Sequence, residues 1–293
     1  MVDVQTQLLP LVIFLAMAAL GAELVWHEFR AVGQRSRTLI LGTVIHTLTF
    51  PVLALAAVLG ALVFELDVSE SLLGGMLLIA ACPSGGFSNV LVLAARANLA
   101  LSIVLTVVSS LLSFFTVPGL IELFGKVLPT VSSSVELPVG QTLLQLFLLV
   151  VLPVAVGMLC RRVWPDYVQP RVESMQKRTQ ILLYAVVFAM VAQQADLFAA
   201  AMAEALPWSI ALCFAVLIAG YGIARLLRIS RADAVTIAIE GGVRNVAVAL
   251  LVAAVVLERV DLAVLPTIYF GAVLIVGFIF ARVSRRFIAV GED

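Results

Sequence analysis

The chain has 293 residues, of which 63% are hydrophobic and only 12% are charged. Soluble domains carry about 25% charged residues, and the mean hydropathy of this chain is +1.16, so its solvent is lipid. The formal net charge is zero, which leaves no basic face for nucleic acid. The composition therefore excludes a water-soluble fold and predicts an integral membrane protein in contact with a lipid bilayer.

A transmembrane helix needs about 20 mostly apolar residues, and nine stretches meet this requirement. In chain order the expected spans are Leu8–Trp26, Thr38–Phe64, Leu72–Ala95, Leu99–Leu123, Gln141–Cys160, Ile181–Phe198, Leu206–Leu227, Ala234–Leu257 and Leu262–Ala281. The N-terminal residues show neither a basic region nor a small-residue cleavage site, so we expect the first stretch to remain as a helix. The predicted fold class is an all-α membrane protein with one transmembrane domain over residues 1–293.

Basic residues occupy alternate loops between these spans, and Lys and Arg concentrate on the cytoplasmic side of membrane proteins. The pattern places the N-terminus outside and the C-terminus in the cytoplasm, in a multi-pass inner or plasma membrane protein. The basic residues on the expected cytoplasmic side are Arg30, Arg35, Arg37, Arg96, Arg161, Arg162, Arg171, Lys177, Arg178, Arg225, Arg228, Arg231, Arg282, Arg285 and Arg286.

The third and eighth spans share the pattern Gly-Gly-x-x-Asn-Val, at residues 85–90 and 241–246. Glycine pairs weaken a helix, and Pro83 removes a backbone donor beside the first pair. The two spans run in opposite directions, which indicates inverted repeats over about residues 6–126, lacking a first helix, and 139–288. Interrupted helices at matching places in two inverted halves indicate a transport site, although glycines also serve close helix packing in membranes.

Glu240 and Arg244 are the ionisable residues that lie well inside a span. Glu240 directly precedes the second glycine pair, and Arg244 lies two residues after it. A carboxylate in low dielectric requires a cation, a proton or an arginine. Neutral oxygens from the first break and the next span complete a set that fits Na⁺: Ser88, Asn89, Ser102 and Thr106. Ser102 and Thr106, four residues apart on one helix face, have the alternative of bonding to their own helix backbone.

These residues resemble the bile acid:sodium symporter family over nearly the whole chain. The most specific matches are Ala81-Cys82-Pro83-Ser84-Gly85-Gly86-Phe87-Ser88-Asn89-Val90, the pair Ser102 and Thr106, and Ala238-Ile239-Glu240-Gly241-Gly242-Val243-Arg244-Asn245. The resemblance implies a ten-helix fold of two inverted repeats, here reduced to nine helices, with a core domain and a panel domain. It also implies a first sodium site at Ser88, Asn89, Ser102, Thr106 and Glu240.

The resemblance implies that the second sodium site of the family is altered in this chain. Two glutamines of that site are replaced by His46 and Arg244, beside Gly241 and Val243. Two positive charges a few ångströms apart repel by several kcal/mol at an effective dielectric of about 20. We therefore expect the guanidinium to replace the second sodium permanently, or alternatively to clamp a substrate carboxylate. His46 either titrates or is a buried neutral side chain bonded to a backbone carbonyl.

The resemblance implies a substrate site at Gly86, Phe87, Asn245 and Arg244, where two half-helix N-termini favour an anion. We expect a secondary transporter that couples one Na⁺ to a small organic anion by alternating access. The core would comprise the third, fourth, eighth and ninth spans, and the panel the other five. Alternatives are a sodium-independent or proton-coupled anion transporter, an arsenite-type exporter using Cys82, and a non-transporting sensor or scaffold. The expected spans carry no Ser-His or Asp-Asp pairing and no HExxH pattern, which disfavours an intramembrane enzyme.

Overall fold

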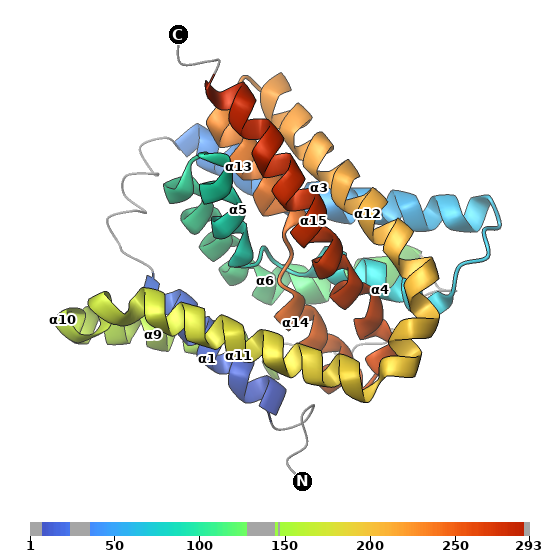
Figure 1. The fold of residues 1–293 in the computed structure, drawn as a ribbon, viewed down its shortest axis with the longest axis horizontal. Helices are drawn as coiled ribbons and strands as arrows, with labels where there is room; N and C mark the ends of the chain where they lie inside the picture. The colour runs from blue at the N-terminus through green and yellow to red at the C-terminus, as the bar shows by residue number, and fades with distance from the viewer. Residues whose placement is uncertain (1–7, 24–35, 128–143, 146, 290–293) are drawn as a thin grey trace.

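The computed structural model describes residues 8–23, 36–127, 144, 145 and 147–289, and this part of the chain is helical without any β-strand. Figure 1 shows the helices in chain order. Their bounds are α1 (Leu9–Glu23), α3 (Ser36–Val63), α4 (Glu70–Ala81), α5 (Phe87–Ala95), α6 (Leu99–Val127), η2 (Phe147–Val151), α9 (Leu152–Val163), α10 (Pro165–Val168), η3 (Gln169–Arg171), α11 (Val172–Gln193), α12 (Ala195–Leu226), α13 (Arg231–Gly242), α14 (Val246–Leu251), η4 (Val252–Val256), η5 (Val260–Ala263) and α15 (Val264–Ala289).

Four unbroken helical segments are long and apolar enough to cross a membrane. They run over Arg37–Val63, Leu99–Lys126, Ala195–Leu226 and Val260–Arg286. A fifth candidate consists of two helices, Phe147–Val163 and Pro165–Gln193, that are bent by 108° at the break between them. The all-α membrane architecture is therefore present, whereas nine spans remain a prediction because the other expected spans are shorter, bent or interrupted helices.

Two predicted boundaries are wrong. The expected loop between Phe198 and Leu206 is helical, because α12 runs without interruption from Ala195 to Leu226. This stretch is rich in alanine, the strongest helix former, and hydropathy delimits the apolar part of a helix and not its ends. The turn falls instead at Gln194, where α11 ends and α12 begins.

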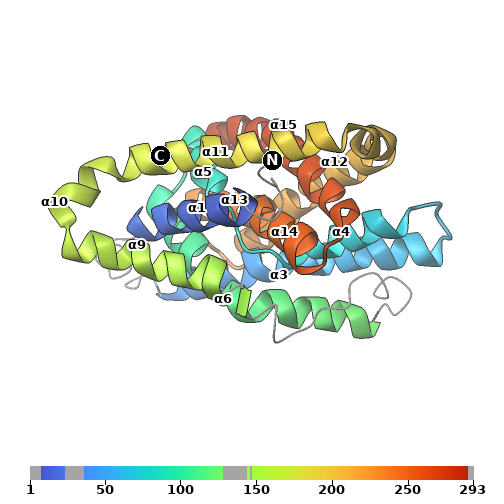
Figure 2. The same cartoon turned by 90° about the horizontal axis from the view of Figure 1, so that it is seen from below.

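The helices form two packing groups. In the first group α1 packs against α9 and α11, and Figure 2 shows it between them. Two glycines bring the backbones together, since a methyl group on Gly21 would lie 2.1 Å from the carbonyl oxygen of Val154 and one on Gly157 would lie 2.0 Å from that of Ala18. Small residues allow this close packing between helices in membranes.

The second group contains the remaining long helices. Both α3 and α12 pack on α13, and α12 also packs along α15. The expectation that the second and seventh spans belong with a panel of five helices is therefore wrong. They pack around the interrupted helices, which leaves α1, α9 and α11 as a separate three-helix unit.

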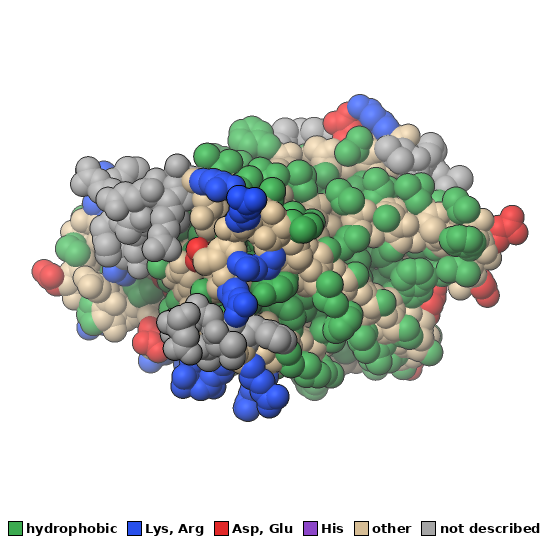
Figure 3. All heavy atoms as spheres, turned by 90° about the horizontal axis from the view of Figure 1, so that it is seen from above, with side chains coloured by type: hydrophobic (Ala, Val, Ile, Leu, Met, Phe, Trp, Pro, Cys, Tyr) green, Lys and Arg blue, Asp and Glu red, His purple; other side chains and the backbone are tan. Residues whose placement is uncertain are grey.

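Charged side chains are unevenly distributed over the surface. In Figure 3 most of the visible Lys and Arg side chains gather in one half of the view, whereas acidic side chains are visible near both ends and apolar side chains cover much of the other half. Large apolar side chains are exposed on the surface, for example Phe115 at 69% and Phe188 at 74%. A largely apolar surface with most of its basic side chains gathered on one side suits a protein that crosses a bilayer, and the direction of the termini stays a prediction.

Candidate functional site

Two interrupted helices cross at the centre of the second group. The first interruption separates α4 from α5 at Cys82–Gly86, and the second separates α13 from α14 at Val243–Asn245. The amide of Gly85 donates to the carbonyl oxygen of Val243 at 3.0 Å, and that of Asn245 donates to the carbonyl oxygen of Pro83 at 2.8 Å. Unwound backbone in a membrane must be satisfied inside the protein, and here the two breaks satisfy each other.

The crossing requires a glycine at its closest point. A methyl group on Gly85 would lie 2.9 Å from the carbonyl oxygen of Arg244, the residue that forms an antiparallel bridge with Ser84. The first glycine pair lies in its break, the second pair ends α13 directly before the other break, and at Gly85 the absence of a side chain lets one backbone approach the other.

Glu240 lies one turn before the second break and is surrounded by hydroxyl groups. Its two carboxylate oxygens accept from Ser84 and Ser102 at 2.5 Å each, and one of them also accepts from Thr106 at 2.9 Å. All four side chains are fully buried. Charge-assisted bonds from a hydroxyl to a carboxylate have lengths of about 2.5–2.7 Å, so these contacts suit an ionised carboxylate.

The five residues predicted to bind sodium lie together in this cluster. The Ser88 hydroxyl is 3.3 Å from that of Thr106, and the hydroxyl of Ser102 lies 2.8 Å from the side-chain oxygen of Asn89 as well as 2.5 Å from Glu240. Hard cations take oxygen ligands of this kind. The single proton of the Ser102 hydroxyl therefore faces two acceptor oxygens, whereas a cation bound among these oxygens would interact with all of them.

Ser84 belongs to the same cluster and was not among the predicted ligands. Its backbone amide donates to the hydroxyl of Ser109 at 2.7 Å, and its own hydroxyl donates to Glu240. The signal that could have identified it is its position between Pro83 and Gly85, where the helix was already expected to unwind.

Arg244 is buried on the other side of the crossing, with 3% of its surface exposed. Its guanidinium donates to the carbonyl oxygens of Cys82 and His46 at 3.0 Å each and lies 4.8 Å from the centre of the Phe50 ring. Within the described residues, no ion pair of 4.0 Å or less joins it to Glu240. The Arg244 guanidinium is therefore held by two carbonyl oxygens and an aromatic face, and not by the Glu240 carboxylate.

The other residues of the altered second ion site adjoin Arg244. His46 is fully buried, and its Nδ1 lies 2.9 Å from the carbonyl oxygen of Gly42, which matches the expectation of a histidine bonded to its backbone. A methyl group on Gly241 would lie 3.5 Å from the α-carbon of His46. The Val243 carbonyl accepts from the amide of Gly85 and, at 3.3 Å, from the Ser84 hydroxyl.

Cys82 is also buried, with 1% of its surface exposed, at the end of α4. Its thiol lies 3.3 Å from the carbonyl oxygen of Leu78, one turn earlier in the same helix. This is the geometry of a side chain that packs within its own helix.

A cavity of about 170 Å³ lies between the three-helix unit and the crossing. The four residues predicted to contact substrate all line it, namely Gly86, Phe87, Arg244 and Asn245. The side-chain oxygen of Asn245 accepts from the amide of Val248 at 3.3 Å and so caps α14. The breaks thus present two helix beginnings and an amide to the cavity.

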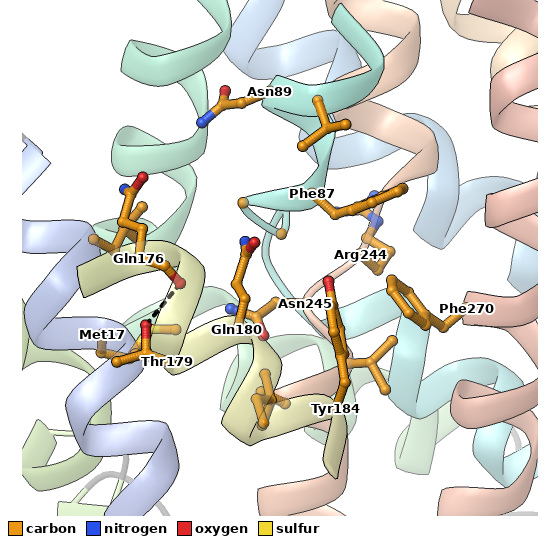
Figure 4. A pocket seen from close by; sticks show the side chains of 18 of the residues that line it. Met17, Phe87, Asn89, Gln176, Thr179, Gln180, Tyr184, Arg244, Asn245 and Phe270 are labelled. Atoms are coloured by element: carbon orange, nitrogen blue, oxygen red, sulfur yellow. Dashed lines mark hydrogen bonds between the residues drawn. The ribbon is translucent and has the colours of Figure 1, made fainter. Parts of the chain in front are cut away.

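The opposite wall comes from α1 and α11, and none of its residues was predicted. On α11 the polar lining residues are Gln176, Thr179, Gln180 and Tyr184, and Figure 4 shows Gln180 and Tyr184 pointing toward the crossing. Gln176 donates to a carboxylate oxygen of Glu23 on α1. Gln176, Gln180 and Tyr184 recur every four residues, which places them on one helix face, and this spacing is the signal that could have identified them.

Comparison with known proteins places these features in a family. The model of the sodium bile acid symporter family matches residues 10–201. An uncharacterised sodium-dependent transporter, YocS, of Bacillus subtilis is 27% identical over 237 residues, which cover 78% of this chain and 68% of that protein. A probable chloroplastic sodium/metabolite cotransporter, BASS2, of rice is 26% identical over 81% of this chain and 54% of its own length. The human P3 protein is 25% identical over 87% of this chain and 52% of its own length, so the chain spans about half the length of the rice and human relatives.

Proposed function

The chain belongs to the sodium bile acid symporter family, and on that premise we propose that it is a secondary active transporter that couples one Na⁺ to the movement of a small organic anion. The members of this family are transporters and not enzymes, and of the similar proteins one is named a sodium-dependent transporter and another a probable sodium/metabolite cotransporter. We propose further that Na⁺ binds among Ser88, Asn89, Ser102, Thr106 and Glu240, with Ser84 as an additional ligand.

The observation that carries this proposal is the buried carboxylate of Glu240. Within the part of the chain that the structure describes, its partners are hydroxyl groups and no basic side chain lies within 4.0 Å. An ionised group in low dielectric is costly unless a counter-charge accompanies it. A monovalent cation among the surrounding oxygens supplies that charge. When the cation leaves, the carboxylate has no counter-charge, and the empty site is unfavourable.

Arg244 supports a stoichiometry of one sodium ion. Its guanidinium already occupies two carbonyl oxygens and an aromatic face, which are the kinds of groups that hold a cation. A sodium ion 4 Å from this fixed charge would be repelled by about 4 kcal/mol at an effective dielectric of 20. We therefore favour Arg244 as a permanent replacement for a second sodium over its use as a clamp, since both terminal nitrogens of its guanidinium already donate to the carbonyl oxygens of Cys82 and His46 and only its Nε is without a hydrogen-bond partner in the described part of the chain.

The anion would bind in the cavity at the beginnings of α5 and α14, where Gly86, Phe87 and Asn245 line the wall. Helix N-termini favour negative charge, and Na⁺ together with Arg244 leaves a net positive charge near the crossing after Glu240 is neutralised. Alternating access would occur by movement of α1, α9 and α11 against the remaining helices, because the cavity lies between these two packing groups.

Thermal unfolding of the purified protein, with NaCl replaced by choline chloride at constant ionic strength, tests the ion site. Sodium should stabilise the wild type, and Glu240→Gln should lose this stabilisation because the substituted amide carries no charge. Glu65→Gln, which neutralises an exposed carboxylate at the end of α3, is the matched control and should respond as the wild type does. An unchanged sodium response in Glu240→Gln would refute the proposed site.

Proton coupling is the second candidate, and the hydroxyl groups around Glu240 favour it because they can also hydrogen-bond a protonated carboxyl group. Liposomes that contain the protein distinguish the two functions. An inward sodium gradient at equal pH should drive uptake if Na⁺ is the coupling ion, whereas a pH gradient without sodium should drive uptake if the proton is. An arsenite-type exporter receives no support, because the Cys82 thiol is bound within α4 and does not line the cavity.

A further inference from the structure

Three aromatic rings from three different helices lie together in the lining of the central cavity. Tyr184 of α11 stacks on Phe270 of α15, with ring centres 5.3 Å apart and an angle of 28° between the rings. Phe87 of α5 meets the same Phe270 edge-on at 5.6 Å. All three line the cavity, and Figure 4 shows them near one another beside Asn245. Rings arranged in this way favour another flat aromatic group beside them.

One turn before Tyr184, on the same face of α11, Gln180 offers an amide that has no partner in the described part of the chain. Gln180 forms no hydrogen bond there, and its Nε2 lies 3.5 Å from the position that a methyl group on Gly86 would occupy. The neighbouring Gln176 is different, because it is bound to Glu23. The Gln180 amide can both donate and accept a hydrogen bond. Because it lies this close to the first break, it can reach a polar atom on the carbon next to a carboxylate that is bound at that break.

The size of the cavity limits what it can hold. Its volume is about 170 Å³, and an apolar protein cavity of about 150 Å³ holds a benzene molecule. Ligand pockets for larger molecules hold about 300–1,000 Å³. A single ring with a short carboxylate arm therefore fits, whereas a skeleton of four fused rings does not.

We propose that the transported anion is a small carboxylate that bears one ring and a hydroxyl or carbonyl oxygen on the carbon next to the carboxylate, and that Gln180 is the residue that recognises this oxygen. The ring lies against Phe87, Tyr184 and Phe270, and the carboxylate lies at the crossing. This inference rests on the proposed anion site, while the ring and oxygen preferences depend on residues that the ion site does not use.

Four probes separate these preferences: 3-phenyllactate, 3-phenylpropionate, lactate and propionate. The dissociation constant of each is measured on the full-length protein by isothermal titration calorimetry in NaCl. The wild type should bind 3-phenyllactate about tenfold more tightly than 3-phenylpropionate, and more tightly than lactate by at least a similar factor. In Gln180→Leu the preference for the hydroxyl should disappear while the preference for the ring remains.

Two further variants make the result specific. Gln193→Leu makes the same chemical change at an exposed position on the same helix and should leave all four dissociation constants unchanged. Phe270→Leu should reduce the preference for the ring and keep the preference for the hydroxyl. The proposal is overturned if the wild type binds none of the probes, if it does not distinguish them, or if Gln180→Leu keeps the hydroxyl preference. Sodium stabilisation measured in the same samples reports on the ion site separately, so its loss would count against the proposed function and not against this substrate class.

Discussion

Replacing Arg244 by glutamine should change the number of sodium ions that the protein binds. The substitution removes a buried charge and its two hydrogen bonds to the carbonyl oxygens of Cys82 and His46. Hydrogen bonds that involve a charged group contribute about 1.5–3 kcal/mol each, so without sodium the variant should be destabilised by about 3 kcal/mol or more. The vacated carbonyl oxygens, joined by the new amide oxygen, should then accept a second sodium ion.

The number of bound ions can be read from the sodium dependence of the free energy of unfolding. Well above the dissociation constant, each ion that binds only the folded state adds about 1.4 kcal/mol for every tenfold increase in its concentration. The wild type should show this slope, and Arg244→Gln should show about 2.8 kcal/mol per tenfold increase. Urea unfolding of the purified protein at several sodium concentrations, with choline as the replacing cation, gives both slopes.

Arg244→Lys is the matched control, because it keeps a positive charge at the same place and should keep the slope of one ion. Equal slopes in the wild type and in Arg244→Gln would refute the idea that Arg244 replaces a second sodium ion. If the slopes are equal and Arg244→Gln also loses binding of an organic anion, the clamp is the better explanation. The absence of any slope in either protein would count against the sodium site as a whole.

Three further substitutions and one control test the crossing and its surroundings. Ser84→Ala removes a hydroxyl that donates to Glu240 at 2.5 Å, so the sodium concentration for half-maximal stabilisation should rise by about three- to tenfold; an unchanged value would remove Ser84 from the site. Gly85→Ala places a methyl group 2.9 Å from a backbone oxygen of the other break and should destabilise the protein by about 1–3 kcal/mol and weaken sodium binding. Gly21→Ala places one 2.1 Å from a backbone oxygen of α9 and should destabilise the fold by a similar amount while sodium binding is retained. Gly60→Ala has no atom within 4 Å of the new methyl group, and thermal unfolding should show it to be neutral; equal effects at all three glycines would contradict this explanation.

The amino-acid sequence by itself was sufficient to predict the lipid environment, the two breaks and the central carboxylate. These features depend on local physical costs. An ionisable residue such as Glu240 is rare inside an apolar run because burying it is expensive, and a glycine pair beside Pro83 weakens a helix wherever the chain later folds. Positions on the first break and on the next span also pointed to the hydroxyl and amide residues around the carboxylate, and the family resemblance implied the same residues.

Only the tertiary structure decided which surfaces meet. Ser84 joins Glu240 because the two breaks pair through their backbones, and the guanidinium of Arg244 turns away from the carboxylate because two carbonyl oxygens from other helices receive it. The wall that carries Gln180 faces the crossing because α11 packs with α1 and not with α12 alone. Contacts of this kind join residues that are far apart in the chain. Their energies depend on distance and direction in space, which residue type and spacing do not specify.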